Sequence, residues 1–340
     1  MGVPMSLDLP FIFMVLMGLA ILAYVILDGF DLGVGILLPL AERADQDMMV
    51  ASIGPFWDAN ETWLVLGVGI LLVAFPQAHG IILSSLYLPV AMMLIALILR
   101  GVAFEFRVKA SGWHQQMWNR LFFVGSLGAA VAQGMMIAGV ITGFKQGALL
   151  VGFEFLVGFG LAGAYALLGS TWLVIKSEGK LHRQALSWAV VCTFVAAVGV
   201  IVISVATPLA SERLLEKWFS WPRILWLSPL PVLTAAAFAG VLASLKRLKD
   251  GTSRREWLPF VLSVWIFVFA FCGLAYSLYP YLVIDRMTIW QAAAATNSLR
   301  FVLIGACIVL PVIVAYTIFS YRVFWGKTRK LSYGDDAGPA

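Results

Sequence analysis

Charged side chains are scarce in this sequence of 340 residues, since Asp, Glu, Lys and Arg together make up 12% of it. Hydrophobic residues make up 61%, and the mean hydropathy is +0.93. Soluble globular domains carry about 25% charged residues, and a disordered chain needs low hydrophobicity. The composition therefore excludes a soluble enzyme and a disordered chain, and it indicates a protein whose solvent is lipid.

Cysteine and histidine are also rare, with three residues of each. Cys192, Cys272 and Cys307 each lie inside an apolar run without CxxC spacing, which excludes a disulfide framework and a zinc or thioredoxin-type site. The histidines lie at span ends or in connections, so we expect no haem bound by this chain, although its 12 methionines leave a Met ligand formally open. P-loop, GxGxxG, GxSxG and HExxH motifs are missing. We therefore expect no catalytic residue and no metal site within this chain.

Roughly nine apolar stretches are long enough to cross a bilayer as helices, which requires about 20 mostly apolar residues each. No long linker or soluble domain interrupts them, so we predict an all-α integral membrane protein with one polytopic domain over residues 1–330 and a mobile tail over residues 331–340. The first stretch has no basic segment before it and is too long for a cleavable signal peptide. The stretches are residues 11–40, 55–75, 81–99, 121–141, 153–175, 185–206, 224–245, 258–278 and 299–324.

Basic residues divide unequally between the two sets of connections that nine crossings create, with 17 of the 23 Lys and Arg residues in one set. Because basic residues favour the cytoplasmic side of a membrane, we predict the N-terminus outside and the C-terminus in the cytoplasm. The net charge of +5 reflects this asymmetry and does not indicate a nucleic-acid partner. The cytoplasmic set is Arg43, Arg100, Arg107, Lys109, Arg120, Lys176, Lys180, Arg183, Lys246, Arg247, Lys249, Arg254, Arg255, Arg322, Lys327, Arg329 and Lys330.

The longest outward connection, residues 207–223, contains a short amphipathic segment over residues 211–219. It places Trp218 and Phe219 beside charged residues. Such a segment is typical of a helix that lies in the membrane interface. We therefore predict an interfacial helix with these two aromatic rings at headgroup depth.

Most of the apolar stretches contain few ionisable residues, and the acidic ones cluster in the first three helices. Asp28 and Asp31 are three residues apart, which places both on one helical face. Asp58 and Glu61 repeat this spacing at the start of the second stretch, and Glu105 lies where the third emerges. Within lipid such side chains are unfavourable unless they face protein or water, so each marks a functional site by default. The predicted orientation places all five in the cytoplasmic half, where they could relay protons toward the membrane interior.

Two structural interpretations of these carboxylates remain open. Asp58 and Glu61 could be acidic residues that the helix dipole favours at an N-terminus. Arg100 and Arg107 could instead pair with Glu105 and hold a loop in place.

Three glycines accompany the aspartates of the first stretch, namely Gly29, Gly33 and Gly35. The first two have the GxxxG spacing that allows membrane helices to approach closely. Packing by itself explains these glycines. It does not explain two neighbouring aspartates, which need a polar path or a partner subunit to receive them.

Six segments spread from the first apolar stretch to the last carry a resemblance to a known family. They are LeuAspGlyPheAspLeuGlyValGly (27–35), a segment over 52–65 that contains TrpAspAlaAsnGlu, ArgGlyValAlaPheGluPheArg (100–107), and residues 165–173, 176–179 and 296–303. Together they resemble the signature segments of subunit II of the cytochrome bd-type quinol oxidases. The form of residues 100–107 and the short outward loops resemble the cyanide-insensitive oxidase branch in particular.

This resemblance implies two four-helix bundles, over about residues 9–145 and 150–280, and a peripheral last helix over about residues 298–325. It implies a partner, the haem-bearing subunit I with the quinol site, in a bacterial cytoplasmic (inner) membrane. This chain would stabilise the complex and supply a proton path from the cytoplasm to the haem that reduces oxygen to water. Quinol would be oxidised near the outer face, which separates charge without a pump. The family leaves open small accessory subunits, bound membrane lipids and a structural quinone.

By the family pattern, Asp58 matches the aspartate of the TrpAsp motif assigned to the proton path, and Asp31 matches the second aspartate of AspGlyPheAsp. Glu105 stands where many relatives carry aspartate, so the carboxylate sits on a longer side chain. The resemblance and the pattern together assign a proton path to Asp58, Glu105, Asp31, Asp28 and Glu61. They assign a structural motif to Trp57, Asn60, Trp63, Arg100, Gly29 and Gly33.

Two other functions are compatible with the same features. A proton-coupled secondary transporter would also bury carboxylates, but inverted repeats with broken helices are expected there, and the two halves of this chain show no clear repeat. A purely structural scaffold fits the missing haem ligands and leaves the aspartate pairs unexplained.

Overall fold

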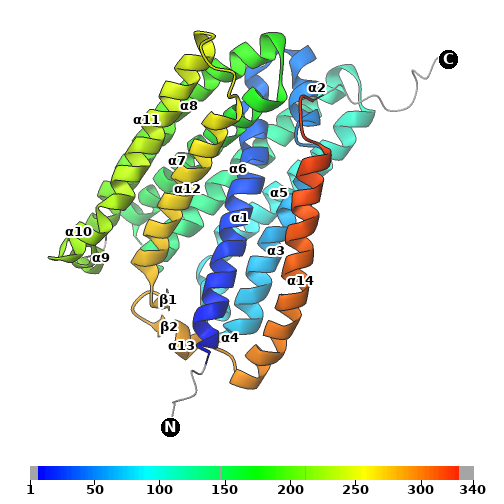
Figure 1. The fold of residues 1–340 in the computed structure, drawn as a ribbon. Coiled ribbons are helices and arrows are strands. Elements are labelled where there is room, and N and C mark those ends of the chain that lie inside the picture. The colour runs from blue at the N-terminus through cyan, green and yellow to red at the C-terminus, as the bar shows by residue number, and fades with distance from the viewer. Residues whose placement is uncertain (1–6, 146, 211, 329–340) are drawn as a thin grey trace.

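The structure is a computed structural model that describes residues 7–145, 147–210 and 212–328, nearly all of which are helical. Within these residues, nine helices are long and apolar enough to cross a membrane, which confirms the predicted number. They pack side by side along one common direction (Figure 1). The spanning helices are α1 (Leu9–Leu37), α3 (Trp57–Ala74), α5 (Tyr87–Lys109), α6 (Gly112–Ile141), α7 (Ala148–Lys176), α8 (Gly179–Ala210), α11 (Pro229–Lys249), α12 (Trp257–Leu278) and α14 (Thr296–Val323).

Short elements connect the spanning helices. One is a two-stranded antiparallel sheet, in which Tyr281 of the first strand pairs with Thr288 of the second. The predicted amphipathic segment forms a helix from Glu212 to Phe219, while Ser211 and the tail over residues 331–340 lie outside the described residues. The connecting elements are η1 (Leu38–Leu40), α2 (Arg43–Ala51), α4 (Pro76–Ser85), α9 (Glu212–Phe219), α10 (Arg223–Leu227), β1 (Tyr281–Val283), β2 (Met287–Thr288) and α13 (Ile289–Ala292).

Two helices extend well beyond the apolar stretches that predict them. The third stretch, residues 81–99, corresponds to α5, which continues to Lys109. The fourth, residues 121–141, corresponds to α6, which already begins at Gly112. Hydropathy detects only the apolar part of a helix, whereas backbone hydrogen bonding continues into polar sequence. Arg100 is therefore a fully buried residue within α5, and its assignment to a cytoplasmic connection is wrong.

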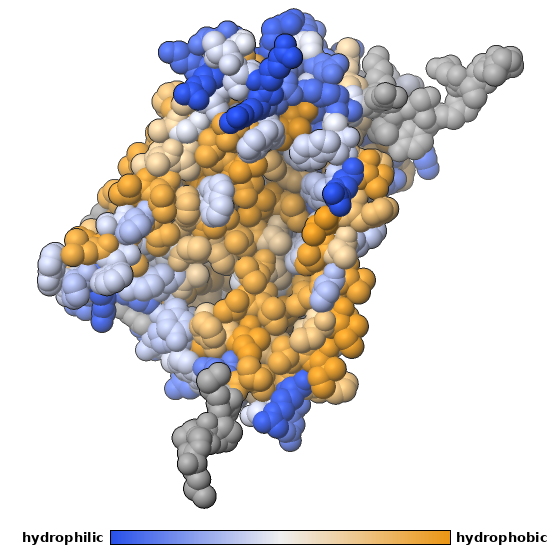
Figure 2. All heavy atoms as spheres, viewed as in Figure 1, coloured by the Kyte–Doolittle hydropathy of each residue, from blue (hydrophilic) through white to orange (hydrophobic). Residues whose placement is uncertain are grey.

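The two ends of the molecule differ in polarity. The first turn of α1 lies beside α13 at one end, and α14 finishes at the other end, near α2 (Figure 1). We call these the α13 end and the α2 end. Figure 2 shows hydrophilic residues gathered at the α2 end, over the α7–α8 and α11–α12 connections, and a broad hydrophobic band below them. The side of the membrane that each end faces stays a prediction.

Two glycines allow α1 and α7 to touch through their backbones. A Cβ atom at Gly33 would lie 1.9 Å from the carbonyl oxygen of Tyr165, and one at Gly169 would lie 2.4 Å from the carbonyl carbon of Gly33. No side chain fits at these separations. One turn earlier, a Cβ atom at Gly29 would lie 2.8 Å from the Tyr165 ring. The close helix contact predicted from the GxxxG spacing is confirmed, and the partner helix is α7.

The contacts of α7 cross the predicted boundary between two bundles. This helix packs against α8 and α12, and also against α1 and α6. At the edge of the molecule, α14 contacts α1 and α3 (Figure 1). The division into two four-helix bundles with a peripheral helix therefore stays a prediction.

Candidate functional site

A buried ion pair joins α1 to α5. Arg100 Nη1 donates to Asp28 Oδ1 over 2.6 Å, and both side chains are completely buried. The same Nη1 lies 3.2 Å from Glu61 Oε1 of α3, whose side chain is 27% exposed. One guanidinium therefore faces carboxylates from two other helices, in surroundings where ionic interactions are much stronger than in water.

The close approach of α6 to α5 helps to bury this arginine. A Cβ atom at Gly125 of α6 would lie 2.8 Å from the backbone nitrogen of Arg100 and 2.7 Å from the carbonyl oxygen of Ala96. Because glycine has no side chain, α6 can cover α5 at the turn that carries the guanidinium. Arg100 is thus surrounded by protein despite its charge.

Asp31 belongs to a second, adjoining set of hydrogen bonds. Asn60 of α3 donates through Nδ2 to Asp31 Oδ2 over 2.8 Å and to the carbonyl oxygen of Leu27 over 3.2 Å. Tyr321 of α14 donates its hydroxyl to Asn60 Oδ1 over 3.1 Å. The buried amide of Asn60 therefore connects three helices. This arrangement agrees with the structural role predicted for Asn60, and that role stays a prediction.

The buried cluster holds more acidic groups than basic ones. Asp28 and Glu61 contact Arg100, and Asp31 lies one turn from Asp28 on α1, so that Arg100 is the one cation of this cluster among the described residues. Asp28 Oδ2 and Asp31 Oδ1 are buried without a hydrogen-bond partner, as are Nε and Nη2 of Arg100. Ionisation of all three carboxylates would leave excess negative charge in and beside the buried cluster, which is unfavourable.

Asp58 and Glu105 lie outside this buried cluster. Both are exposed, at the α2 ends of α3 and α5. Asp58 lies in the first turn of α3, as the helix-dipole interpretation requires, and Glu61 follows one turn later. The Trp57 ring packs against the Phe104 ring, with centroids 4.8 Å apart. This contact joins the start of α3 to the end of α5.

The interpretation of Arg100 and Arg107 as a loop clamp on Glu105 is wrong. Arg107 donates to Asp47 over 2.7 Å and to Asn119 over 2.7 Å, and Arg100 binds Asp28 as described above. Both arginines connect helices, because α5 continues past the apolar stretch and carries them against α1, α2 and α6.

The sequence analysis missed three hydrogen-bonded residues that lie near the buried acids. Gln133 of α6 donates to the Tyr24 hydroxyl over 2.7 Å and accepts from the Tyr165 hydroxyl over 2.6 Å, and all three residues are buried. Tyr24 lies one helical turn before Asp28 on α1. A glutamine inside an apolar span is a signal that the sequence offered for this site. Trp63 also packs beside Tyr24, in a small apolar cluster.

Metal coordination is not indicated for this network. Among the residues that the structure describes, no group of three or more His, Cys, Asp or Glu side chains could hold a metal ion. The cation that the carboxylates contact is the guanidinium of Arg100. Fold and site together define a multi-pass membrane protein with a cluster of charged side chains buried between its first helices.

Comparison with known proteins assigns the family. Residues 9–324 match the family described as cytochrome bd terminal oxidase subunit II, and the chain belongs to this family. It is 28% identical to cytochrome bd-I ubiquinol oxidase subunit 2 of Escherichia coli (strain K12), a match that covers 95% of this chain and 96% of the relative. It is 26% identical to cytochrome bd ubiquinol oxidase subunit 2 of Bacillus subtilis (strain 168), covering 91% of this chain and 94% of the relative.

A solved structure shows the same fold. The bd oxidase from Geobacillus thermodenitrificans contains a chain that superposes with a TM-score of 0.72 at 16% sequence identity. The match covers 94% of this chain and 99% of that one. The predicted membership in subunit II is confirmed, and the assignment to the cyanide-insensitive branch stays a prediction.

Proposed function

We propose that this chain works as subunit II of a heterodimeric quinol oxidase in a bacterial cytoplasmic membrane. It supports the haem-bearing subunit I and conducts protons from the cytoplasm toward the haem where oxygen is reduced to water. The relatives named above are ubiquinol oxidase subunits, which supports a quinol as the electron donor of the complex. The family match favours this function over a secondary transporter and over a passive scaffold.

The observation that carries the proton-path proposal is the graded burial of successive acids. Asp58 is exposed, Glu61 one turn further along α3 is partly exposed, and Asp28 beyond Arg100 is completely buried. A proton taken up at the surface can thus pass to a group that contacts both water and the buried cluster. Glu105, exposed at the neighbouring end of α5, widens the acidic surface from which protons are collected.

The surface beside these acids suits a protein partner. Val65 of α3 is 72% exposed, and Ile95 and Ile98 of α5 are 67% and 66% exposed. These apolar side chains leave the α3 and α5 surfaces available for burial against another membrane subunit. Exposed carboxylates at the edge of such a surface are unfavourable against lipid, so we assign this surface to subunit I.

The test is an Asp58→Asn variant of the assembled oxidase. We expect quinol-driven oxygen uptake to fall by roughly tenfold or more, because the amide cannot carry a proton. The reduced-minus-oxidised haem spectrum should stay unchanged. Asp250→Asn, an exposed acid between α11 and α12, is the matched control and should leave uptake unchanged.

Two results would contradict the assignment of Asp58. Normal oxygen uptake would remove it from the proton path. Loss of haem or of the partner subunit would show that Asp58 acts in assembly.

A further inference from the structure

A chain of hydrogen bonds between three buried side chains ends beside Asp28. The Tyr165 hydroxyl of α7 donates to Gln133 Oε1 of α6 over 2.6 Å, and Gln133 Nε2 donates to the Tyr24 hydroxyl of α1 over 2.7 Å. Tyr24 and Asp28 are four residues apart, which places both side chains on one face of α1. The Tyr24 hydroxyl interacts with the Asp28 carboxylate. Two further helices are thus connected to the innermost acid.

The direction of these hydrogen bonds determines where the Tyr24 hydrogen can go. Because the Gln133 oxygen accepts from Tyr165, the amide nitrogen faces Tyr24. An amide nitrogen donates and does not accept, so Tyr24 has to donate its own hydrogen to another group. Within the described residues, Asp28 Oδ2 is buried without a hydrogen-bond partner. A Tyr24 hydroxyl that turns toward Oδ2 satisfies both groups.

The other groups around Asp28 do not supply this hydrogen bond. Arg100 Nη1 donates to Oδ1, and no nitrogen of Arg100 is bonded to Oδ2. The Tyr165 and Tyr321 hydroxyls donate to Gln133 and Asn60 instead. Tyr24 is therefore the donor left for Oδ2 among the described residues. The charged and titratable groups that face Asp28 are Arg100 of α5, Glu61 of α3, Asp31 and Tyr24 of α1, Tyr165 of α7 and Tyr321 of α14.

Tyr24 lies deeper between the helices than the acids do. At a rise of 1.5 Å per residue, it is about 6 Å beyond Asp28 along α1, near the middle of that helix and away from the α2 end where Asp58 is exposed (Figure 1). Its side chain is buried and packs beside Trp63 of α3. The hydroxyl is thus shielded from water by protein, where a hydrogen bond to a charged group is strong.

We propose that Gln133 and Tyr165 position the Tyr24 hydroxyl to donate to Oδ2 of ionised Asp28, and that this bond speeds the release of protons from Asp28. The inference rests on the proton path proposed above. A donor to a carboxylate stabilises the ionised form. When protonated Asp28 gives its proton to a water molecule of the path, Tyr24 keeps its own hydrogen and stabilises the carboxylate that remains. Tyr24, Gln133 and Tyr165 are therefore positioning residues.

The test is quinol-driven oxygen uptake by the assembled oxidase with Tyr24→Phe, measured in light and in heavy water. We expect uptake to fall by about tenfold at unchanged haem content, as for the loss of a hydrogen bond to a charged group. The ratio of the rate in light water to the rate in heavy water should rise, because proton release becomes slower relative to the other steps. A structural defect would reduce the number of active molecules and leave this ratio unchanged.

Gln133→Met tests the same bond from its other side, since methionine has a similar size and no N–H donor. The defect should be of the same kind as in Tyr24→Phe and no larger. The double variant should be no slower than Tyr24→Phe, because Gln133 acts through Tyr24.

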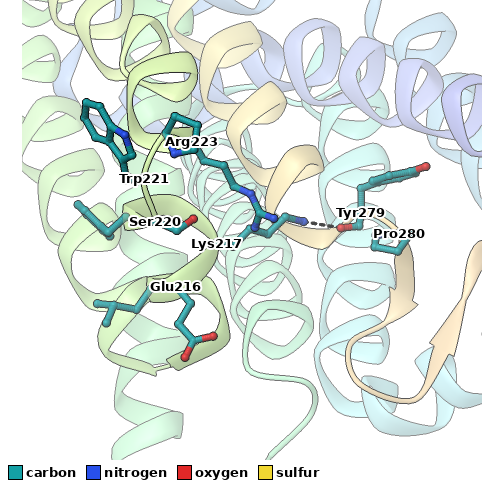
Figure 3. A pocket seen from close by; sticks show the side chains of 10 residues that line it. Glu216, Lys217, Ser220, Trp221, Arg223, Tyr279 and Pro280 are labelled. Carbon is teal, nitrogen blue, oxygen red and sulfur yellow. Dashed lines mark hydrogen bonds between the residues drawn. The ribbon is translucent and has the colours of Figure 1, made fainter.

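Tyr279→Phe is the matched control. Tyr279 lines a cavity of about 830 Å³ near the α13 end, where its backbone carbonyl oxygen accepts from Lys217 (Figure 3). The substitution keeps the ring and the backbone and removes a hydroxyl far from the buried acids. Oxygen uptake and the ratio between light and heavy water should both stay unchanged.

Three results would overturn the proposal. They are normal uptake in Tyr24→Phe, lowered uptake with an unchanged ratio, and loss of haem or of the partner subunit in both Tyr24→Phe and Gln133→Met. Failure of the proton path itself would be recognised by normal uptake in Asp58→Asn and Glu61→Gln. Failure of this inference alone would leave those two variants slow and Tyr24→Phe at the normal rate.

Discussion

The two carboxylate pairs share one sequence spacing and have different surroundings. Asp28 and Asp31 of α1 are both completely buried. Asp58 of α3 is exposed, and Glu61 is partly exposed. Because α1 is covered by α3, α6 and α7, its acids meet only protein, whereas the start of α3 remains open on one side. The same local pattern thus yields buried acids in one helix and acids that remain in contact with solvent in the next.

Removal of Arg100, the cation that Asp28 and Glu61 share, should produce the largest effect of the predicted changes. Arg100→Gln leaves Asp28 buried without its charged partner, a change that costs about 3–5 kcal/mol in comparable buried pairs. We expect little assembled complex in the membrane, measured as haem content and co-purifying subunits. Arg100→Lys should recover part of it. Normal assembly of Arg100→Gln would show that the cluster does not depend on its ion pair.

A change at Glu61, which lies between the exposed Asp58 and the buried pair, should lower turnover without reducing assembly of the complex. Glu61→Gln keeps an oxygen that can face Arg100 but cannot exchange a proton, so oxygen uptake should fall by roughly tenfold at normal haem content. If Asp58 and Glu61 lie on one path, Asp58→Asn combined with Glu61→Gln should be no slower than the slower single variant. Multiplied defects in the double variant would instead indicate two parallel paths.

The smallest expected effect concerns the side of the cluster that faces α14. Tyr321→Phe removes one hydrogen bond to Asn60, which is worth about 1 kcal/mol. We expect a slightly lower thermal unfolding temperature of the complex and unchanged oxygen uptake. Tyr316→Phe on the same helix, where the side chain is 59% exposed, is the control. Reduced uptake in Tyr321→Phe would extend the proton path into the Asp31 side of the cluster.

Much of this site could be predicted because charges inside apolar spans are conspicuous. Asp28, Asp31 and Glu61 were recognisable from their positions alone. The partners of these acids were harder to predict, and Arg100 was misassigned to a connection because α5 continues beyond its apolar stretch. Gln133 bonds to Tyr24, which is 109 positions away in the chain. No local pattern specifies a contact of that range.

Composition and hydrophobic patterning were sufficient to establish a helical membrane protein with nine spans, since each span must bury its own backbone groups in lipid. The spacing of Gly29 and Gly33 indicated a close helix contact, because it too is a property of the local sequence. Which acids lose contact with water and which arginine compensates them depended on how the helices pack. Desolvation and ion pairing act between segments that are distant in the chain, and helix packing alone brings those segments together.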